Sequence, residues 1–138
     1  MRIYATLAVS MVIGAGSVYG ADRKQKAESK PVTPVVLSAA ESTAVEAGVR
    51  NALKDPESSR FGEFAAGKDD KQTTMVCGYV NAKNAFGGYV GASPFVGGIV
   101  NDKFVPIKIG STAVDARVVI EVCKDIGLDV RTLARQRQ

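Results

Sequence analysis

Hydrophobic positions recur at helical spacing over residues 38–53. The positions that share one face are Val45, Val49, Ala52 and Leu53. Ser38 and Glu41 match the S-x-x-E capping box, in which each residue satisfies an unpaired backbone donor of the other. Pro56 disfavours helical geometry in the residue before it. The pattern therefore predicts a helix that starts at Ser38 and ends near Lys54.

A second helical pattern covers residues 111–126, where four hydrophobic residues are spaced four apart. They are Val114, Val118, Val122 and Ile126. Thr112 with Asp115 resembles an N-terminal cap, and Gly127 is well placed to stop the helix. The β-branched content of 117–123 favours a strand instead. Length and caps favour the helix, and the strand stays open as the alternative.

Between these segments, residues rich in β-branched and aromatic side chains predict short strands. The predicted strands are 61–66, 73–81, 95–100 and 103–109. Asn101-Asp102 suits a two-residue turn, because both residue types tolerate positive φ. Pro106 lacks a backbone donor, so its strand should lie at a sheet edge or carry a bulge. Alternation within 73–81 separates Met75, Cys77 and Tyr79 from Thr74, Val76 and Val80.

The order of elements predicts an α+β fold. It comprises an N-terminal helix, a small and mostly antiparallel sheet, a C-terminal helix and one disulfide. The segment at 78–82 (GYVNA) is echoed at 88–92 (GYVGA). This echo fits two strands of one hairpin, or a strand followed by a glycine-rich excursion.

The N-terminus has the features of a secretory signal peptide. Arg2 precedes an apolar stretch at 5–15, and Val18 and Gly20 are small enough for cleavage before Ala21. The alternative is an uncleaved membrane anchor, since nearly 20 uncharged residues could almost span a bilayer. The polar residues near the end of the stretch favour cleavage. We therefore predict a periplasmic or secreted protein with no transmembrane segment after cleavage.

Four segments follow from this interpretation. They are the signal peptide 1–20, a flexible polar leader 21–37, one domain 38–128 and a basic polar tail 129–138. Cleavage takes 20 of the 138 residues and leaves 118, and loss of Arg2 reduces the formal charge from +4 to +3. A charge this small does not indicate nucleic-acid binding.

The chain has two cysteines, Cys77 and Cys123. An oxidising compartment favours a disulfide between them. Closing a chain loop of that length stabilises a fold by about 4 kcal/mol in the chain-entropy treatment. The alternative is two buried free thiols, which pack as small apolar side chains.

Catalytic patterns are sparse. The chain has no histidine, which removes the commonest general base near neutral pH and every His-containing zinc site. No sequence pattern pairs any two of the carboxylates that could serve in general acid–base chemistry, which are Glu57, Glu63, Asp102 and Glu121. Asp69-Asp70 is best interpreted as a charged turn. We predict no metal site and no cofactor.

The best candidate site is the segment 81–89, which combines amides, an ammonium group and two aromatic rings on an expected turn. Its candidate binding residues are Asn81, Lys83, Asn84, Phe86, Gly87, Gly88 and Tyr89. Loops held on a rigid sheet often carry binding function. The alternative is local, since Asn81 and Asn84 could bond their own backbone in Asx turns.

Two segments of the chain carry a resemblance. Residues 53–61 read LKDPESSRF, and residues 76–91 read VCGYVNAKNAFGGYVG, with Pro94-Phe95 following. The chain resembles a group of small exported bacterial proteins that join an LKDPxSxxF segment to a VCGxVNxKNxxGGYxG segment. The resemblance covers about residues 45–96. It implies a bacterial, envelope-facing exported domain and no particular reaction.

Three functional hypotheses follow. The first is a non-catalytic binding module whose unknown partner is an envelope component or another protein, and not a nucleic acid. The second is a small periplasmic hydrolase that uses carboxylates. The third is a structural envelope subunit that pairs with another chain through its glycine-rich strands.

Overall fold

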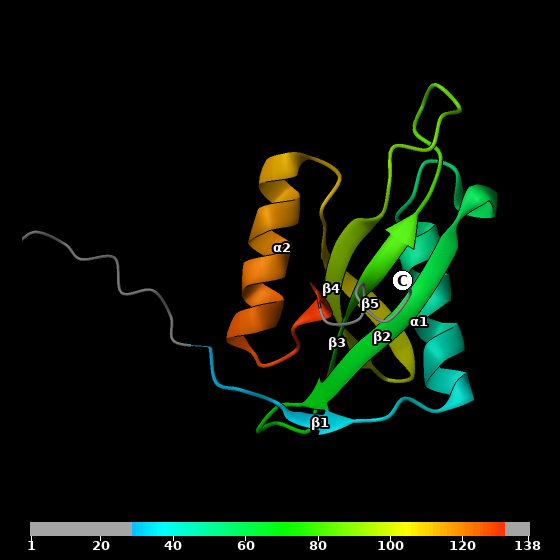
Figure 1. Cartoon of the computed structure of the whole chain (residues 1–138). Helices are drawn as coiled ribbons and strands as arrows, with labels where there is room; N and C mark the ends of the chain where they lie inside the picture. The colour runs from blue at the N-terminus through cyan, green and yellow to red at the C-terminus, as the bar shows by residue number, and fades with distance from the viewer. Residues whose placement is uncertain (1–28, 132–138) are drawn as a thin grey trace, which may run out of the picture.

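The computed structural model describes residues 29–131, and its helices and strands confirm the α+β class (Figure 1). The strands are β1 (Thr33–Val35), β2 (Arg60–Lys68), β3 (Thr74–Asn81), β4 (Ser93–Val100) and β5 (Lys103–Ile109). The α-helices are α1 (Ala39–Asn51) and α2 (Ala113–Asp125), and a short 3-10 helix, η1, spans Pro56–Ser58. The predicted signal peptide lies outside the described residues.

The five strands form one sheet in the order β1-β2-β3-β4-β5, and every neighbouring pair is antiparallel. The β4–β5 turn matches the prediction, since Asn101 and Asp102 have φ values of 50° and 60°. Pro106 lies in the edge strand β5, opposite Gly97, where the register also shifts between Val96 and Gly97. At a sheet edge or at a bulge, a strand can lack one backbone hydrogen-bond donor without losing a ladder hydrogen bond, so both features accommodate Pro106.

The sheet separates two hydrophobic clusters, because successive residues of β3 point to opposite faces. On one face Cys77 packs with Val119 and Cys123 of α2. On the other face Val76 packs with Val45 and Val49 of α1. The two helices therefore cover opposite faces of the sheet, and Figure 1 shows α2 to the left of the strands and α1 to their right.

Helix α1 begins as predicted. The Glu41 amide donates to Ser38 Oγ, and the Ser38 amide donates to the Glu41 carboxylate at 2.8 Å. The serine bond lowers the pKa of Glu41 from its ordinary value of 4.5. The helix ends at Asn51 and is followed by η1, for which the Asp55 side chain accepts from the Ser58 amide.

The helical interpretation of 111–126 is confirmed, with Thr112 as N-cap and Gly127 at φ +85°. Of the four residues in the predicted stripe, Ile126 is buried and the other three lie on an exposed face. Val114, Val118 and Val122 are 74%, 45% and 40% exposed. Val119 and Cys123, one position further along, are fully buried. The disulfide sets this rotation, because Cys123 must face β3.

The bond between Cys77 and Cys123 confirms the predicted disulfide. It joins β3 to α2 with Cα atoms 6.2 Å apart. Both cysteines are fully buried in the cluster under α2. Within residues 29–131, none of the helices combines the length and apolar character that crossing a membrane requires.

The folded unit is wider than the predicted range 38–128. Val32 is buried and its amide donates to the Ile126 carbonyl at 2.9 Å, while β1 pairs with β2. Val130 is fully buried in the same cluster. The predicted boundaries of the leader 21–37 and the tail 129–138 were wrong, because each segment contributes residues to the folded domain. Val32 and Val130 are isolated valines in polar stretches of sequence, and both pack in the cluster under α2.

Candidate binding site at the 82–92 loop

The connection from β3 to β4, residues 82–92, leaves the sheet and projects beyond the ends of the strands (Figure 1). A single antiparallel bridge joins Lys83 to Tyr89 at its base. Gly87 turns the chain with φ +79°, a conformation that glycine adopts without a steric cost. The sequence echo of GYVNA and GYVGA is therefore a strand followed by an excursion, and not a pair of hairpin strands.

Asn84 shapes this loop from within. Its side-chain oxygen accepts from the Phe86 amide at 2.9 Å and from the Gly88 amide at 3.1 Å. The Gly87 amide donates to the Asn84 carbonyl. The local Asx interpretation is thus confirmed for Asn84, whose oxygen is used in folding. Asn81 differs: its buried Oδ1 has no hydrogen-bond partner within residues 29–131.

Ser58 of η1 fastens the loop to the α1 side of the domain. The Lys83 amide donates to Ser58 Oγ at 2.9 Å, and the Tyr89 hydroxyl donates to the Ser58 carbonyl at 3.0 Å. These bonds bring together residues 53–61 and 76–91, the two segments that carry the sequence resemblance. Segments far apart in the chain therefore form one structural unit.

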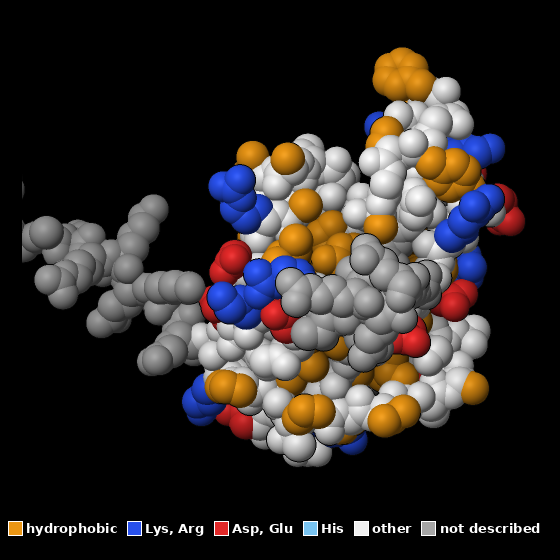
Figure 2. Space-filling model, in the orientation of Figure 1, with side chains coloured by type: hydrophobic (Ala, Val, Ile, Leu, Met, Phe, Trp, Pro, Cys, Tyr) orange, Lys and Arg blue, Asp and Glu red, His pale blue; other side chains and the backbone are white. Residues whose placement is uncertain are grey.

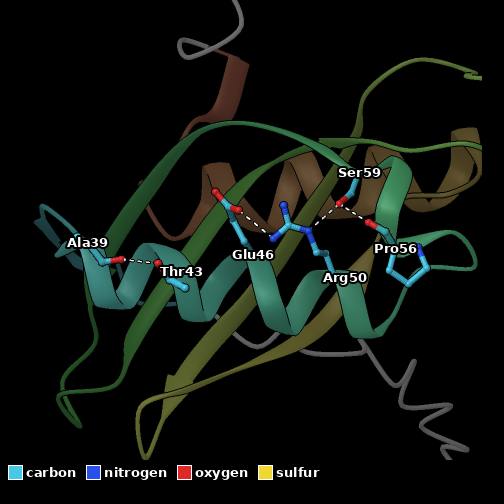
Figure 3. Close-up of polar contacts among 6 residues, drawn as sticks. All are labelled: Ala39, Thr43, Glu46, Arg50, Pro56 and Ser59. Carbon is cyan, nitrogen blue, oxygen red and sulfur yellow. Dashed lines mark hydrogen bonds and ion pairs between the residues drawn. The ribbon is translucent and has the colours of Figure 1, made fainter.

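The base of this unit is held to α1 by Arg50 (Figure 3). Its guanidinium lies 3.0 Å from the Glu46 carboxylate and donates through Nε to Ser59 Oγ at 3.0 Å. Ser59 in turn donates to the Pro56 carbonyl. The chain between α1 and β2 is thereby fixed under the loop.

Two cations lie against one aromatic ring at the neck of the loop. The Arg60 guanidinium carbon is 4.9 Å from the centroid of Tyr89, and the Lys83 ammonium is 5.8 Å from it. Phe86 is 96% exposed and Val90 is 71% exposed. Hydrophobic atoms stand at the end of the projection in Figure 2. Exposed apolar side chains that gather in one patch are typical of a contact surface.

A cleft of about 350 Å³ lies between this loop, the end of α1 and the adjacent ends of β3, β4 and β5. Its apolar lining comprises Ala52, Leu53, Val80, Ala82, Ala85, Val90 and Ile109. Its polar lining comprises Lys54, Lys83, Asn84, Ser93 and Ser111. Among the described residues, no carboxylate lines it.

The residues predicted from the sequence overlap this candidate site in part. Lys83 and Asn84 line the cleft, whereas Phe86 and Tyr89 lie on the projecting loop outside its lining. Gly87 and Gly88 shape the turn, and Asn81 ends β3. The missed residues include Leu53, Lys54, Ser93, Ile109 and Ser111. Leu53 and Lys54 belong to the LKDP segment that carries the resemblance, which could have indicated them. Nothing in the sequence marks the other three.

The carboxylates considered for catalysis are dispersed over η1, β2, the β4–β5 turn and α2. Asp69 shapes its own turn by accepting from the Lys71 and Thr73 amides. A hydrogen bond from Lys30 lowers the pKa of Asp70 from its ordinary 3.8. The part of the chain that the structure describes contains no grouping of three or more potential metal ligands.

Comparison with protein-family models, with curated proteins and with solved structures found no match to this chain.

Proposed function

We propose that this protein is an exported, non-catalytic binding module of the bacterial envelope. Its contact surface is the 82–92 loop together with the cleft beside it. The carrying observation is that a cleft and an exposed loop meet where residues 53–61 join residues 76–91. The export signal, the disulfide and the resemblance support the location outside the cytoplasm.

The chemistry of the site favours binding. Apolar walls with a few polar groups are the usual composition of a ligand pocket. Hydrolysis by carboxylates needs two carboxyl groups held across one cleft. The polar residues that line the cleft instead carry ammonium, amide and hydroxyl groups. The hydrolase hypothesis therefore has less support than the binding module.

The structural-subunit hypothesis also has less support. The glycine-rich strands were expected to pair with another chain. β3 is hydrogen-bonded to β2 and β4, and β4 to β3 and β5. Both edges of β3 and β4 are occupied within the domain, so an added strand would have to pair with β5, with β1 or with the part of β2 that precedes Ala66.

The binding surface is tested by retention of envelope components on immobilised protein. Phe86→Ser removes a hydrophobic side chain that is 96% exposed on the loop. Val36→Ser is the matched control, because Val36 is 97% exposed on a different part of the chain. The proposal predicts that Phe86→Ser loses a component that wild type and Val36→Ser retain. Identical retention by all three folded proteins would contradict it.

Export is tested separately. Protein recovered from the envelope fraction of its native host should begin at Ala21 or Asp22, as measured by intact mass. A chain that still begins with Arg2 or Met1 would indicate a retained anchor and remove the basis for an exported module.

A further inference from the structure

We propose that the cleft binds an apolar carboxylate, meaning a short hydrocarbon group that ends in a carboxyl anion. This inference rests on the proposed function and names its ligand class. It is carried by the combination of apolar walls with two lysines that have no anionic partner in the described part of the chain.

The walls define the apolar part of the ligand. Leu53 comes from the segment after α1, Val80 from β3 and Ile109 from β5, and Val90 lines the cleft from the loop. A volume of about 350 Å³ is at the lower end of the range for small-molecule sites. The cleft therefore suits a group of modest size and not a large ring system.

The charges define the other part of the ligand. Lys54 and Lys83 both line the cleft, and within residues 29–131 neither forms an ion pair with a carboxylate. The Lys83 ammonium lies over the Tyr89 ring, where the aromatic contact restrains it. Charge-assisted hydrogen bonds to an anion are about twice as strong as neutral ones. Two such cations without a lining carboxylate select a negative ligand.

Neutral donors complete the polar end. Ser93 and Ser111 contribute hydroxyl groups to the cleft. The Asn84 side-chain oxygen accepts two hydrogen bonds inside the loop, so the side chain can offer a ligand only its amino group, which is a donor. All of these groups can donate a hydrogen bond, and a carboxylate is an acceptor only.

Two sources share this chemistry. One is a fatty acid, whose chain fills the cleft. The other is the C-terminal carboxylate of a peptide that ends in an apolar residue. Each has a matched compound with the same apolar body and no anion.

The test is titration of ¹⁵N-labelled protein, followed by NMR shifts of the cleft amides. Octanoate is compared with octylammonium, and N-acetyl-Ala-Val with its C-terminal amide. The proposal predicts that at least one acid shifts amides of residues 52–54 and 82–85, while its partner compound does not. Binding of octanoate alone indicates an acyl source, and binding of the peptide acid alone indicates a C-terminus.

Lysine variants test whether the anion of the ligand binds at the cleft. Lys54→Gln and Lys83→Gln should each weaken acid binding by about tenfold. Lys103→Gln is the matched control, because Lys103 is exposed at the start of β5, next to the Asn101-Asp102 turn. It should leave binding unchanged. An equal loss in the Lys103 variant would overturn the site assignment.

Two other results would overturn the ligand class. One is equal binding of octylammonium and octanoate, and the other is no shift with either acid. In both cases the retention experiment with Phe86→Ser remains an independent test of the proposed function. Loss of an envelope component with that variant would keep the binding surface while the apolar carboxylate fails.

Discussion

The connections on either side of β4 belong to the same antiparallel sheet and differ in construction. The one from β4 to β5 consists of Asn101 and Asp102, whose positive φ values close a minimal turn. The one from β3 to β4 is the 82–92 loop, which places Phe86 in solvent and Lys83 at a cleft. Joining antiparallel strands requires only two residues.

Strand pairing therefore does not explain why the 82–92 loop is longer than a two-residue turn. The loop has its own internal hydrogen bonds through Asn84 and external ones to Ser58. It is held in a defined shape while its hydrophobic tip stays exposed. Such a loop is expected where a partner supplies the missing contacts, which is why we propose the binding surface at this end of the sheet.

The largest effect should come from the disulfide, which supports the sheet that both connections share. Cys77→Ala combined with Cys123→Ala should lower the free energy of unfolding by about 4 kcal/mol, because the unfolded chain regains loop entropy. Urea denaturation without reductant measures this. A loss under about 1 kcal/mol would mean that the core holds α2 against β3 without the bond.

The next largest effect is a difference in stability between alanine substitutions at a packed glycine and at a solvent-exposed one. A Cβ on Gly97 would clash with the Phe104 ring and would lie 2.5 Å from the Val105 carbonyl oxygen. Gly97→Ala should therefore destabilise the protein by about 1–3 kcal/mol. Gly88→Ala is the control, because the nearest atom to its Cβ is Asn84 Oδ1 at 3.8 Å. Thermal unfolding that ranks Gly88→Ala as the more damaging change would contradict this packing.

A smaller effect distinguishes the two connections themselves. Asn84→Ala removes the acceptor for the Phe86 and Gly88 amides and should cost about 1 kcal/mol. Asn101→Gly should change stability by less than about 0.5 kcal/mol, because glycine accepts positive φ. Amide exchange in the first variant should rise within 82–92 only. Equal exchange rates in wild type and variant would show that the loop does not depend on Asn84.

The smallest effect is electrostatic and comes from an ion pair that lies outside both the 82–92 loop and the β4–β5 turn. The Lys108 ammonium lies 2.7 Å from the Asp115 carboxylate, which joins β5 to α2. A hydrogen bond from Lys108, followed by one from Thr112, lowers the pKa of Asp115 from 3.8. The resulting stability is present above pH 3.8 and is lost as pH falls through the lower folded-state pKa.

Asp115→Asn should therefore flatten the acid side of the stability–pH curve and leave its shape above pH 5 unchanged. Denaturation midpoints measured from pH 2 to pH 7 test this. An unchanged acid side would show that the ion pair does not contribute.

Local patterns predicted local structure well. The capping box at Ser38 and the Asn101-Asp102 turn depend on residues a few positions apart, so the sequence contains all the needed information. The rotation of α2 was not predictable from spacing. The stripe through Val118 is regular, yet the disulfide turns Val119 and Cys123 toward the sheet.

Contacts between distant segments were the harder part. Val32 looked like part of a polar leader, and only its packing with Ile126 and Val130 shows that it is core. The cleft was also missed, since Lys54, Ser93 and Ser111 come from separate stretches of the chain. The loop at 82–92 was found because its aromatic and amide residues are adjacent in sequence.

The most direct test of the binding surface compares amide hydrogen exchange in the free protein and in its complex with the retained envelope component. The account predicts slower exchange within residues 82–92 and 52–54, and unchanged exchange at Asn101 and Asp102. Protection confined to the β4–β5 turn, or to any surface that excludes the 82–92 loop, would contradict it.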